Sequence, residues 1–247
     1  ILSPSRGRVS FNDLDLEKHR EELQALIGYL PQEFGTYENM TATQFLDYQA
    51  MLKGIWDKEE REYIVGNAID SVHLSENRNQ KIHTFSGGMK QRIGIAQTLL
   101  KLPRVLVVDE PTAGLDPRER IRFRNLLSEL AKDRIVIFST HIIEDISSSC
   151  NELAVLLEGK VKFVGSPKDL IDRTRGNVWQ AHIPESDLAE VRRSTNVVHH
   201  MRDAGRVRVR ILAQEKPLAE AKQVLPTLED AYMWLMGRKK QKQGGHP

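Results

Sequence analysis

The sequence predicts an α/β protein with a parallel β-sheet covered by helices on both faces, a helical subdomain, and a small C-terminal α+β appendage. Two short and entirely apolar stretches, residues 105–108 and 135–138, are separated by an amphipathic helix. Between residues 41 and about 74, apolar residues recur at the spacings of three and four that are typical of helices. After Pro167 the pattern changes to short strands around one helix.

The helix between the two apolar stretches has a start signal and a buried stripe. Asp116 suits the N-cap, Pro117 suits the first helical position, and Glu119 completes a capping-box pattern. The stripe consists of Phe123, Leu126, Leu127 and Leu130. Strand, helix and strand in this order, with fully apolar strands, indicate parallel pairing and a sheet that is buried on both faces.

The N-terminal part carries shorter signals. Residues 9–11 and 25–29 read as strands on either side of a polar helix at 17–23, and the second strand runs into turn residues 31–35. The helical pattern that follows is carried by Phe45, Tyr48, Leu52 and Ile55. Phe34 and Tyr37 lie in the glycine-containing loop before it, where exposed aromatic side chains commonly anchor an interface.

The C-terminal part predicts a hairpin and a separate small domain. Residues 153–157 and 160–164 flank the turn Glu158-Gly159. Strands at 178–183, 197–200 and 207–212 surround a helix near 188–193, and Thr227 caps a last helix that runs to Met236. We therefore expect one domain at residues 1–165 and an α+β accessory region at 166–247. That region ends in a basic tail of Arg238, Lys239, Lys240 and Lys242, which is either solvated or in contact with anionic lipid.

Composition narrows the function classes. The formal net charge is only +2, so no nucleic-acid partner is expected. The single cysteine, Cys150, cannot form an internal disulfide, which favours a reducing compartment. No apolar run approaches the roughly 18 residues of a membrane span. If the protein works at a membrane, we expect it to act peripherally, from the cytoplasmic face and through partners.

Polar residues follow each apolar strand at the sheet edge where ligands of such folds bind. Asp109 and Glu110 come directly after the first strand, and Ser139, Thr140 and His141 follow the second. An aspartate at this place suits Mg²⁺, because a hard cation prefers oxygen ligands. The adjacent glutamate suits proton abstraction from an attacking water.

A second candidate site lies at the start of another helix. Ser86 is placed as an N-cap, and Gly87 and Gly88 allow the backbone to approach an anion closely. The amphipathic helix that follows presents Met89, Ile93, Ala96 and Leu100 on one side. By itself, Ser-Gly-Gly is more often a simple capped turn.

The order of these motifs resembles that of the ATP-binding-cassette (ABC) family. The ordered set is Pro31-Gln32, Ser86-Gly87-Gly88, Asp109-Glu110-Pro111-Thr112, Gly114-Leu115-Asp116 and Ser139-Thr140-His141. It matches the Q-loop, signature motif, Walker B strand, D-loop and switch histidine of that family. The resemblance covers residues 1–165 and implies a P-loop NTPase-like fold with a helical signature subdomain at about 38–100.

The resemblance also implies a role for each matching residue. Gln32 would sense the Mg²⁺ ion and the attacking water, Asp109 would organise Mg²⁺, Glu110 would be the general base, and His141 would clamp the γ-phosphate of ATP. The signature residues Ser86, Gly87 and Gly88 would bind the ATP held by a second ATPase subunit, with Asp116 at the dimer seam. The plainer readings are a loop glutamine, a strand-end histidine and a helix cap. Met89 replaces the usual glutamine, a variant found in export-type cassettes.

A phosphate-binding loop of the type Gly-x-x-x-x-Gly-Lys-Ser/Thr does not occur in the 247 residues. The only Gly-Lys pair, Gly159-Lys160, is followed by Val161 and reads as a hairpin turn. The first domain is thus expected to lack its N-terminal strands and Walker A loop, either as a fragment or as a natural truncation. On this hypothesis the chain alone binds ATP poorly.

The leading hypothesis is the ATP-hydrolysing subunit of an export-type ABC transporter, with ATP and Mg²⁺ as cofactors and a transmembrane permease subunit as partner. Asn39-Met40-Thr41 and residues 226–232 resemble cassettes that export drugs or peptide antibiotics. One alternative is a soluble ABC-type ATPase that acts on ribosomes or DNA. Another is a non-catalytic interaction protein.

Overall fold

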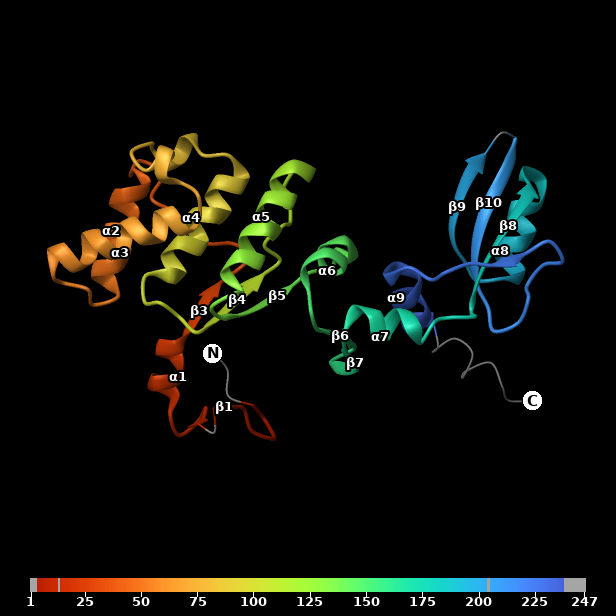
Figure 1. Cartoon of the computed structure of the whole chain (residues 1–247), viewed down its shortest axis with the longest axis horizontal. Helices are drawn as coiled ribbons and strands as arrows, with labels where there is room; N and C mark the ends of the chain where they lie inside the picture. Colours follow the sequence, from red (N-terminus) through yellow and green to blue (C-terminus); the bar gives the residue numbers. More distant parts are fainter. Residues whose placement is uncertain (1–3, 13, 204, 238–247) are drawn as a thin grey trace. The chain divides into compact units, whose positions relative to one another are not determined.

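The computed structural model describes residues 4–12, 14–203 and 205–237 (Figure 1). The chain divides into two compact units, Ile1–His141 and Ile142–Pro247, whereas the sequence places a boundary at residue 165. The basic tail at 238–242 lies outside the described residues.

The first unit is built on a three-stranded parallel sheet in the order β3-β4-β5. The strands are β3 (Ile27–Leu30), β4 (Val105–Asp109) and β5 (Ile135–Ser139). Helix α5 (Pro117–Leu130) makes the crossover from β4 to β5, which confirms the predicted strand–helix–strand unit and the α/β class.

Helices cover one face of this sheet. Leu30, Leu106 and Val108 are buried in one core with the predicted α5 stripe and with helix α4 (Gly87–Leu99). On the other face Tyr29, Ile135 and Ile137 are 55%, 51% and 54% exposed. Within the described residues, the prediction of helices on both faces is therefore correct for one face only.

The predicted helical subdomain is present and consists of α2 (Ala42–Leu52), α3 (Lys58–Ser71) and α4. The short 3₁₀ turns η1 (Ser75–Asn77) and η2 (Ile82–Thr84) lie between α3 and α4. The helical pattern between 41 and 74 is split because Gly54, at φ +85°, ends the first helix and Asp57 caps the second. Thr41 and Gln44 form a capping box at the start of α2.

The segment before β3 differs slightly from the prediction. A small antiparallel pair, β1 (Ser10–Phe11) and β2 (Leu14–Asp15), precedes α1 (Arg20–Leu26). The helix starts and ends three residues later than expected and continues directly into β3. Local patterns could not locate this junction because no glycine or proline separates the two elements.

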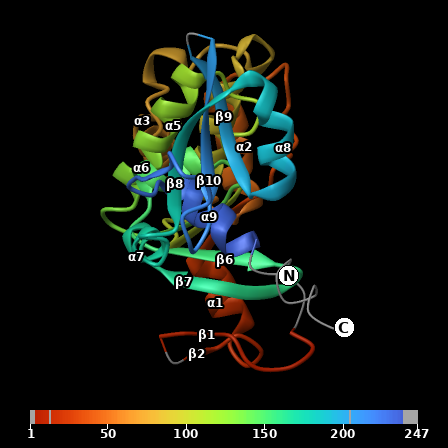
Figure 2. The same ribbon diagram turned by 90° about the vertical axis from the view of Figure 1, so that its right-hand side faces the viewer.

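The second unit contains the predicted hairpin, β6 (Leu153–Leu157) and β7 (Lys160–Gly165), visible in Figure 2. The hairpin shares a core with α6 (Ile143–Ser149), α7 (Pro167–Asp172) and α9 (Leu228–Gly237), in which Val155 and Phe163 lie with Leu170, Leu228 and Ala231. This shared core is the physical reason that the compact units divide before the hairpin.

The rest of the second unit is a four-stranded antiparallel sheet in the order β11-β8-β10-β9. Its elements are β8 (Val178–Pro184), η3 (Glu185–Asp187), α8 (Leu188–Ser194), β9 (Val197–Asp203), β10 (Arg206–Leu212) and β11 (Lys222–Gln223). Val191 of α8 packs on Ala181, Val207 and Val209, so that α8 covers one face. The predicted strands at 178–183, 197–200 and 207–212 and the predicted helix between the first two are therefore present in the predicted order, whereas α7 and β11 were not predicted.

Candidate functional site

The carboxyl ends of the three parallel strands bring the sequence-predicted residues of the Q-loop, the Walker B strand and the switch histidine to one edge. Gln32 follows β3, Asp109 ends β4 and is followed by Glu110, and His141 lies two residues beyond β5. Since β3, β4 and β5 run parallel and in register, these residues emerge side by side at the edge where α/β sheets bind ligands.

The carboxylate of Glu110 is the centre of this group. The amide Nε2 of Gln32 donates to its Oε2 at 3.2 Å, and Nδ1 of His141 lies 3.2 Å from its Oε1. The side chain of Glu110 is 31% exposed and that of His141 is 69% exposed. Three residues that are far apart in the sequence therefore meet at one carboxylate that solvent can reach.

Ser139 fixes Asp109, the last residue of β4, and Glu110, which follows it, from the neighbouring strand. Its hydroxyl donates to Oδ1 of Asp109 and accepts from the N–H of Glu110 at 3.0 Å. The same N–H also points at the carbonyl of Ser139, at 3.2 Å. Sequence reasoning assigned no role to Ser139. The parallel register, which pairs Asp109 with Ser139, is the signal that could have identified it.

The backbone of Glu110 has φ +44°, a left-handed conformation that costs a non-glycine residue about 1–2 kcal/mol. The contacts with Ser139 hold it there, and the N–H of Ala113 donates to its carbonyl at 3.2 Å. The chain reverses at this point and leads through the turn at Thr112–Leu115 into α5. Strain of this kind persists where surrounding contacts over-determine the backbone, and it is common at functional sites.

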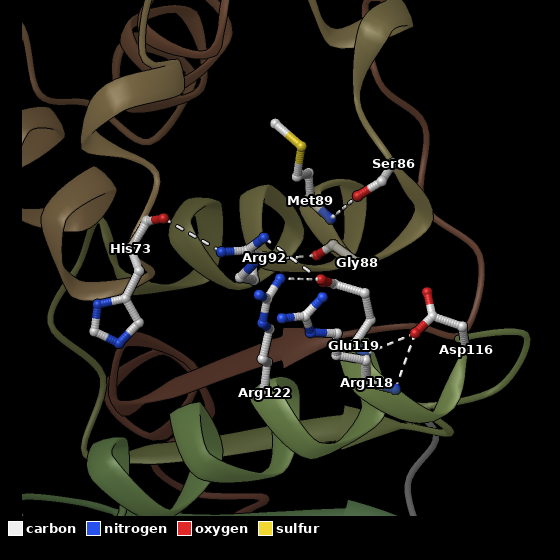
Figure 3. Close-up of polar contacts among 9 residues, drawn as sticks. All are labelled: His73, Ser86, Gly88, Met89, Arg92, Asp116, Arg118, Glu119 and Arg122. Atoms are coloured by element: carbon white, nitrogen blue, oxygen red, sulfur yellow. Dashed lines mark hydrogen bonds and ion pairs between the residues drawn. The ribbon is translucent and has the colours of Figure 1, made fainter.

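The second group of predicted residues lies at the N-termini of α4 and α5 (Figure 3). Oγ of Ser86 accepts from the N–H of Met89 at 3.2 Å and caps α4, as predicted, with Gly87 and Gly88 as its first residues. Oδ1 of Asp116 accepts from two backbone N–H groups of α5, both at 2.9 Å, which confirms the cap there. Each helix end carries the partial positive charge that attracts anions.

The capping-box interpretation of Glu119 is wrong in its second half. Instead of turning back to Asp116, the carboxylate of Glu119 contacts Arg122 at 2.6 Å and Arg92 at 3.6 Å. The carboxylate pairs with the two arginines and not with the backbone N–H of Asp116, because charge-assisted contacts are stronger than a hydrogen bond from a neutral N–H group.

Phe34 and Tyr37, the two aromatic residues of the loop after β3, differ in their surroundings. A Cβ atom on Gly94 of α4 would lie 2.5 Å from the ring of Phe34, so Phe34 packs closely on α4. Tyr37 is 51% exposed and meets Tyr48 edge-on at a centroid distance of 5.4 Å. Phe45, which belongs to the predicted helical pattern, is fully buried.

Among the residues that the structure describes, no three His, Cys, Asp or Glu side chains gather closely enough to hold a metal ion by themselves. In the same part of the chain, no helix has the length and apolarity required to cross a membrane.

Comparison with known proteins identifies the family. A family model described as ABC transporter matches residues 1–113. The structure of CbiO1 from Clostridium perfringens, part of the ABC transporter complex CbiONQ, superposes with a TM-score of 0.62 and 30% identity over 70% of each chain. The chain belongs to the ABC transporter ATP-binding family. The P-loop NTPase-like fold inferred from the motif order is thereby confirmed.

Curated ABC proteins show the same relationship. YxlF of Bacillus subtilis (strain 168), an uncharacterized ABC transporter ATP-binding protein, is 35% identical over 185 residues, which are 75% of this chain and 61% of YxlF. The linearmycin resistance ATP-binding protein LnrL of the same organism is 29% identical over 178 residues, 72% of this chain and 57% of LnrL. The chain thus spans about three fifths of these ABC relatives.

Proposed function

We propose that the protein is the ATP-hydrolysing subunit of an ABC exporter, which drives transport through a separate transmembrane permease at the cytoplasmic face of a membrane. The main support for this proposal is that Gln32 and His141 both contact the carboxylate of Glu110. Two relatives support the export direction: LnrL, named for linearmycin resistance, and YbhF of Escherichia coli, named as a probable multidrug transporter component. CbiO1 is itself part of a transporter complex.

In this proposal Glu110 accepts a proton from the water that attacks the γ-phosphate. Its two oxygens are engaged by Gln32 and His141 in this structure, so both partners lie where they can orient that water and the phosphate. The backbone N–H of Glu110 donates to the hydroxyl and to the carbonyl of Ser139, and these bonds hold the backbone that carries the carboxylate.

A Mg²⁺ ion fits the donor set at the strand ends. Asp109 and the amide oxygen of Gln32 offer the oxygen ligands that Mg²⁺ prefers, and phosphate and water oxygens normally complete its octahedral shell. The need for these further ligands agrees with the lack of a self-sufficient metal cluster in the described residues. When bound, the ion would neutralise charge on the phosphates of ATP.

The residues at the N-termini of α4 and α5 would contact a second ATPase subunit and its nucleotide. The N-terminus of α4, with Ser86, Gly87 and Gly88, would face the γ-phosphate of ATP held by the partner copy, and Asp116 would lie at the seam between the two copies. The partial positive charge at each helix end supports an anion-binding role. Both Ser86 and Asp116 act as helix caps in the structure, and this does not conflict with a second role in the dimer.

Turnover in the full-length protein tests this proposal. We expect His141→Ala to reduce Mg²⁺-dependent phosphate release by about 10²–10³-fold, because Glu110 loses the partner that helps to align phosphate and water. His199→Ala is the matched control, since His199 is exposed on β9 in the other unit. An unchanged turnover number for His141→Ala would remove this residue from the catalytic group.

We also expect Tyr37 to contact the permease subunit. Tyr37→Ala should leave the ATPase rate of the isolated subunit nearly intact. It should weaken the binding free energy for the permease by about 1–2 kcal/mol, so that less permease co-purifies with the variant. Tyr63, which is 72% exposed on α3, provides the matched control. Phe34 is excluded from this test, because its packing on α4 means that Phe34→Ala would disturb the core. Equal retention of the permease by Tyr37→Ala and Tyr63→Ala would place the docking surface elsewhere.

A further inference from the structure

Glu119 is largely buried between two helices that carry the proposed dimer contacts. Its side chain is 14% exposed and that of Arg92, its partner on α4, is 16% exposed. Glu119 Oε2 lies 3.6 Å from Arg92, while Oε1 lies 2.6 Å from the more exposed Arg122 on its own helix. Figure 3 shows the carboxylate pointing from the first turn of α5 toward the first turns of α4.

Arg92 extends the same network to the backbone. Its Nε donates to the carbonyl of Gly88 at 3.4 Å, and its Nη1 donates to the carbonyl of His73 at 3.2 Å. Burial lowers the pKa of this guanidinium, and the nearby charge of Glu119 opposes that effect. Arg92 thus joins the start of α4, the segment after α3, and Glu119 of α5.

Gly88 shows how closely the two helix ends approach. A Cβ atom at Gly88 would lie 2.1 Å from Oε2 of Glu119 and 2.9 Å from its Cδ. No ordinary side chain fits there unless Glu119 moves. The backbone at Gly88 is helical, so the requirement for glycine comes from this contact and not from an unusual φ angle.

The electrostatics explain why a carboxylate is stable at this place. Glu119 lies in the first turn of α5 and against the first turn of α4, so its negative charge faces the positive ends of two helix dipoles. Arg92 and Arg122 supply the remaining compensation. One side chain therefore favours a single arrangement of both helix ends.

We infer that Glu119 is a positioning residue that holds the Ser86–Gly88 helix end in a fixed orientation to Asp116, ready for the nucleotide of a partner copy. Glu119 acts through Arg92 and Gly88 and not by touching ATP. This inference rests on the proposed function, because only a nucleotide bound between two copies gives the arrangement of the two helix ends a role. It assigns Glu119 a role that the capping-box pattern did not indicate.

The functional test uses the full-length protein with Glu110→Gln, in which the ATP concentration for half-maximal dimer formation is measured by sedimentation. Adding Glu119→Ala should raise that concentration by about tenfold, because the two helix ends must be ordered during association. Glu129→Ala is the matched control. Glu129 of α5 lies 3.0 Å from His73, so it joins α5 to the same segment after α3 but lies away from both helix ends. The control should leave the midpoint unchanged.

A second measurement needs no nucleotide. Gly88→Ala should lower the melting temperature clearly when Glu119 is present and much less in the Glu119→Ala background, where the new methyl group has room. Equal losses in both backgrounds would show that Glu119 does not lie against Gly88, and would overturn the inference. The inference would equally fail if Glu119→Ala and Glu129→Ala gave the same dimer midpoint. If the Glu110→Gln protein stays monomeric at saturating ATP, the proposed function is contradicted instead. The melting temperatures of the Gly88→Ala variants then still test whether Glu119 lies against Gly88.

Discussion

Glu110→Gln is expected to lower Mg²⁺-dependent ATP turnover by about 10²–10⁴-fold, the usual contribution of a general base. Glutamine retains the size and the hydrogen-bonding capacity of the side chain, so the contact with Gln32 can persist while the group that accepts the proton is lost. The binding of ATP should change little, because the substitution leaves Asp109 and its bond with Ser139 in place.

Phosphate release under single-turnover conditions measures this effect separately from product dissociation. Glu152→Gln is the control, since Glu152 is an exposed carboxylate before β6 in the second unit. A Glu110→Gln protein with normal single-turnover rates would mean that another group abstracts the proton.

Asp230→Ala is expected to destabilise the C-terminal unit by about 3–5 kcal/mol, because it leaves the charge of Arg210 without its partner in a largely buried place. Arg210 reaches from β10 to α9, where its Nε and Nη2 donate to the carboxylate of Asp230 at 2.8 and 2.6 Å. Asp230 is only 3% exposed and also completes the cap of α9 with Thr227.

Urea denaturation followed by the fluorescence of Trp179 and Trp234, which both lie in this unit, measures the loss. Asp172→Ala is the matched control, because the pair of Asp172 with Arg175 is exposed and should contribute less than about 1 kcal/mol. Similar free energies of unfolding for the two variants would show that the Arg210–Asp230 pair does not anchor α9.

The same pair predicts a pH dependence. Burial by itself would raise the pKa of Asp230, but the hydrogen bonds from Arg210 and Thr227 outweigh burial and hold this pKa below its ordinary value of 3.8. The contribution of a carboxylate with a lowered folded-state pKa is fully present above the unfolded-state value and is lost as the pH falls through the folded-state value. The difference in stability between wild type and Asp230→Asn should therefore narrow only below about pH 3.8. A difference that narrows already near neutral pH would point to another group.

Strong local signals made much of the fold predictable. The apolar stretches at 105–108 and 135–138 and the caps at Ser86 and Asp116 correspond to real strands and helix starts. The motif order also indicated which residues come together. Gln32, Glu110 and His141 meet because each follows one of three adjacent parallel strands.

The remaining features depend on contacts between distant segments. Glu119 has a regular capping-box spacing, and only the fold shows that Arg92 is its partner. Ser139 reads as an ordinary strand-end residue until the pairing of β4 with β5 places it beside Asp109. The expected boundary at residue 165 follows a change in pattern along the chain, whereas the core shared by Phe163 and Leu228 forms across it.

In the proposed mechanism, the group around Glu110 hydrolyses ATP between two copies of the protein. Sedimentation of the full-length Glu110→Gln protein with Mg²⁺ and ATP is the decisive measurement, because a dimer that cannot hydrolyse its nucleotide cannot reopen by turnover. We predict a stable dimer with ATP and a monomer with ADP or without nucleotide. A Glu110→Gln protein that remains monomeric at saturating ATP would show that the group around Glu110 does not act between two copies of the protein.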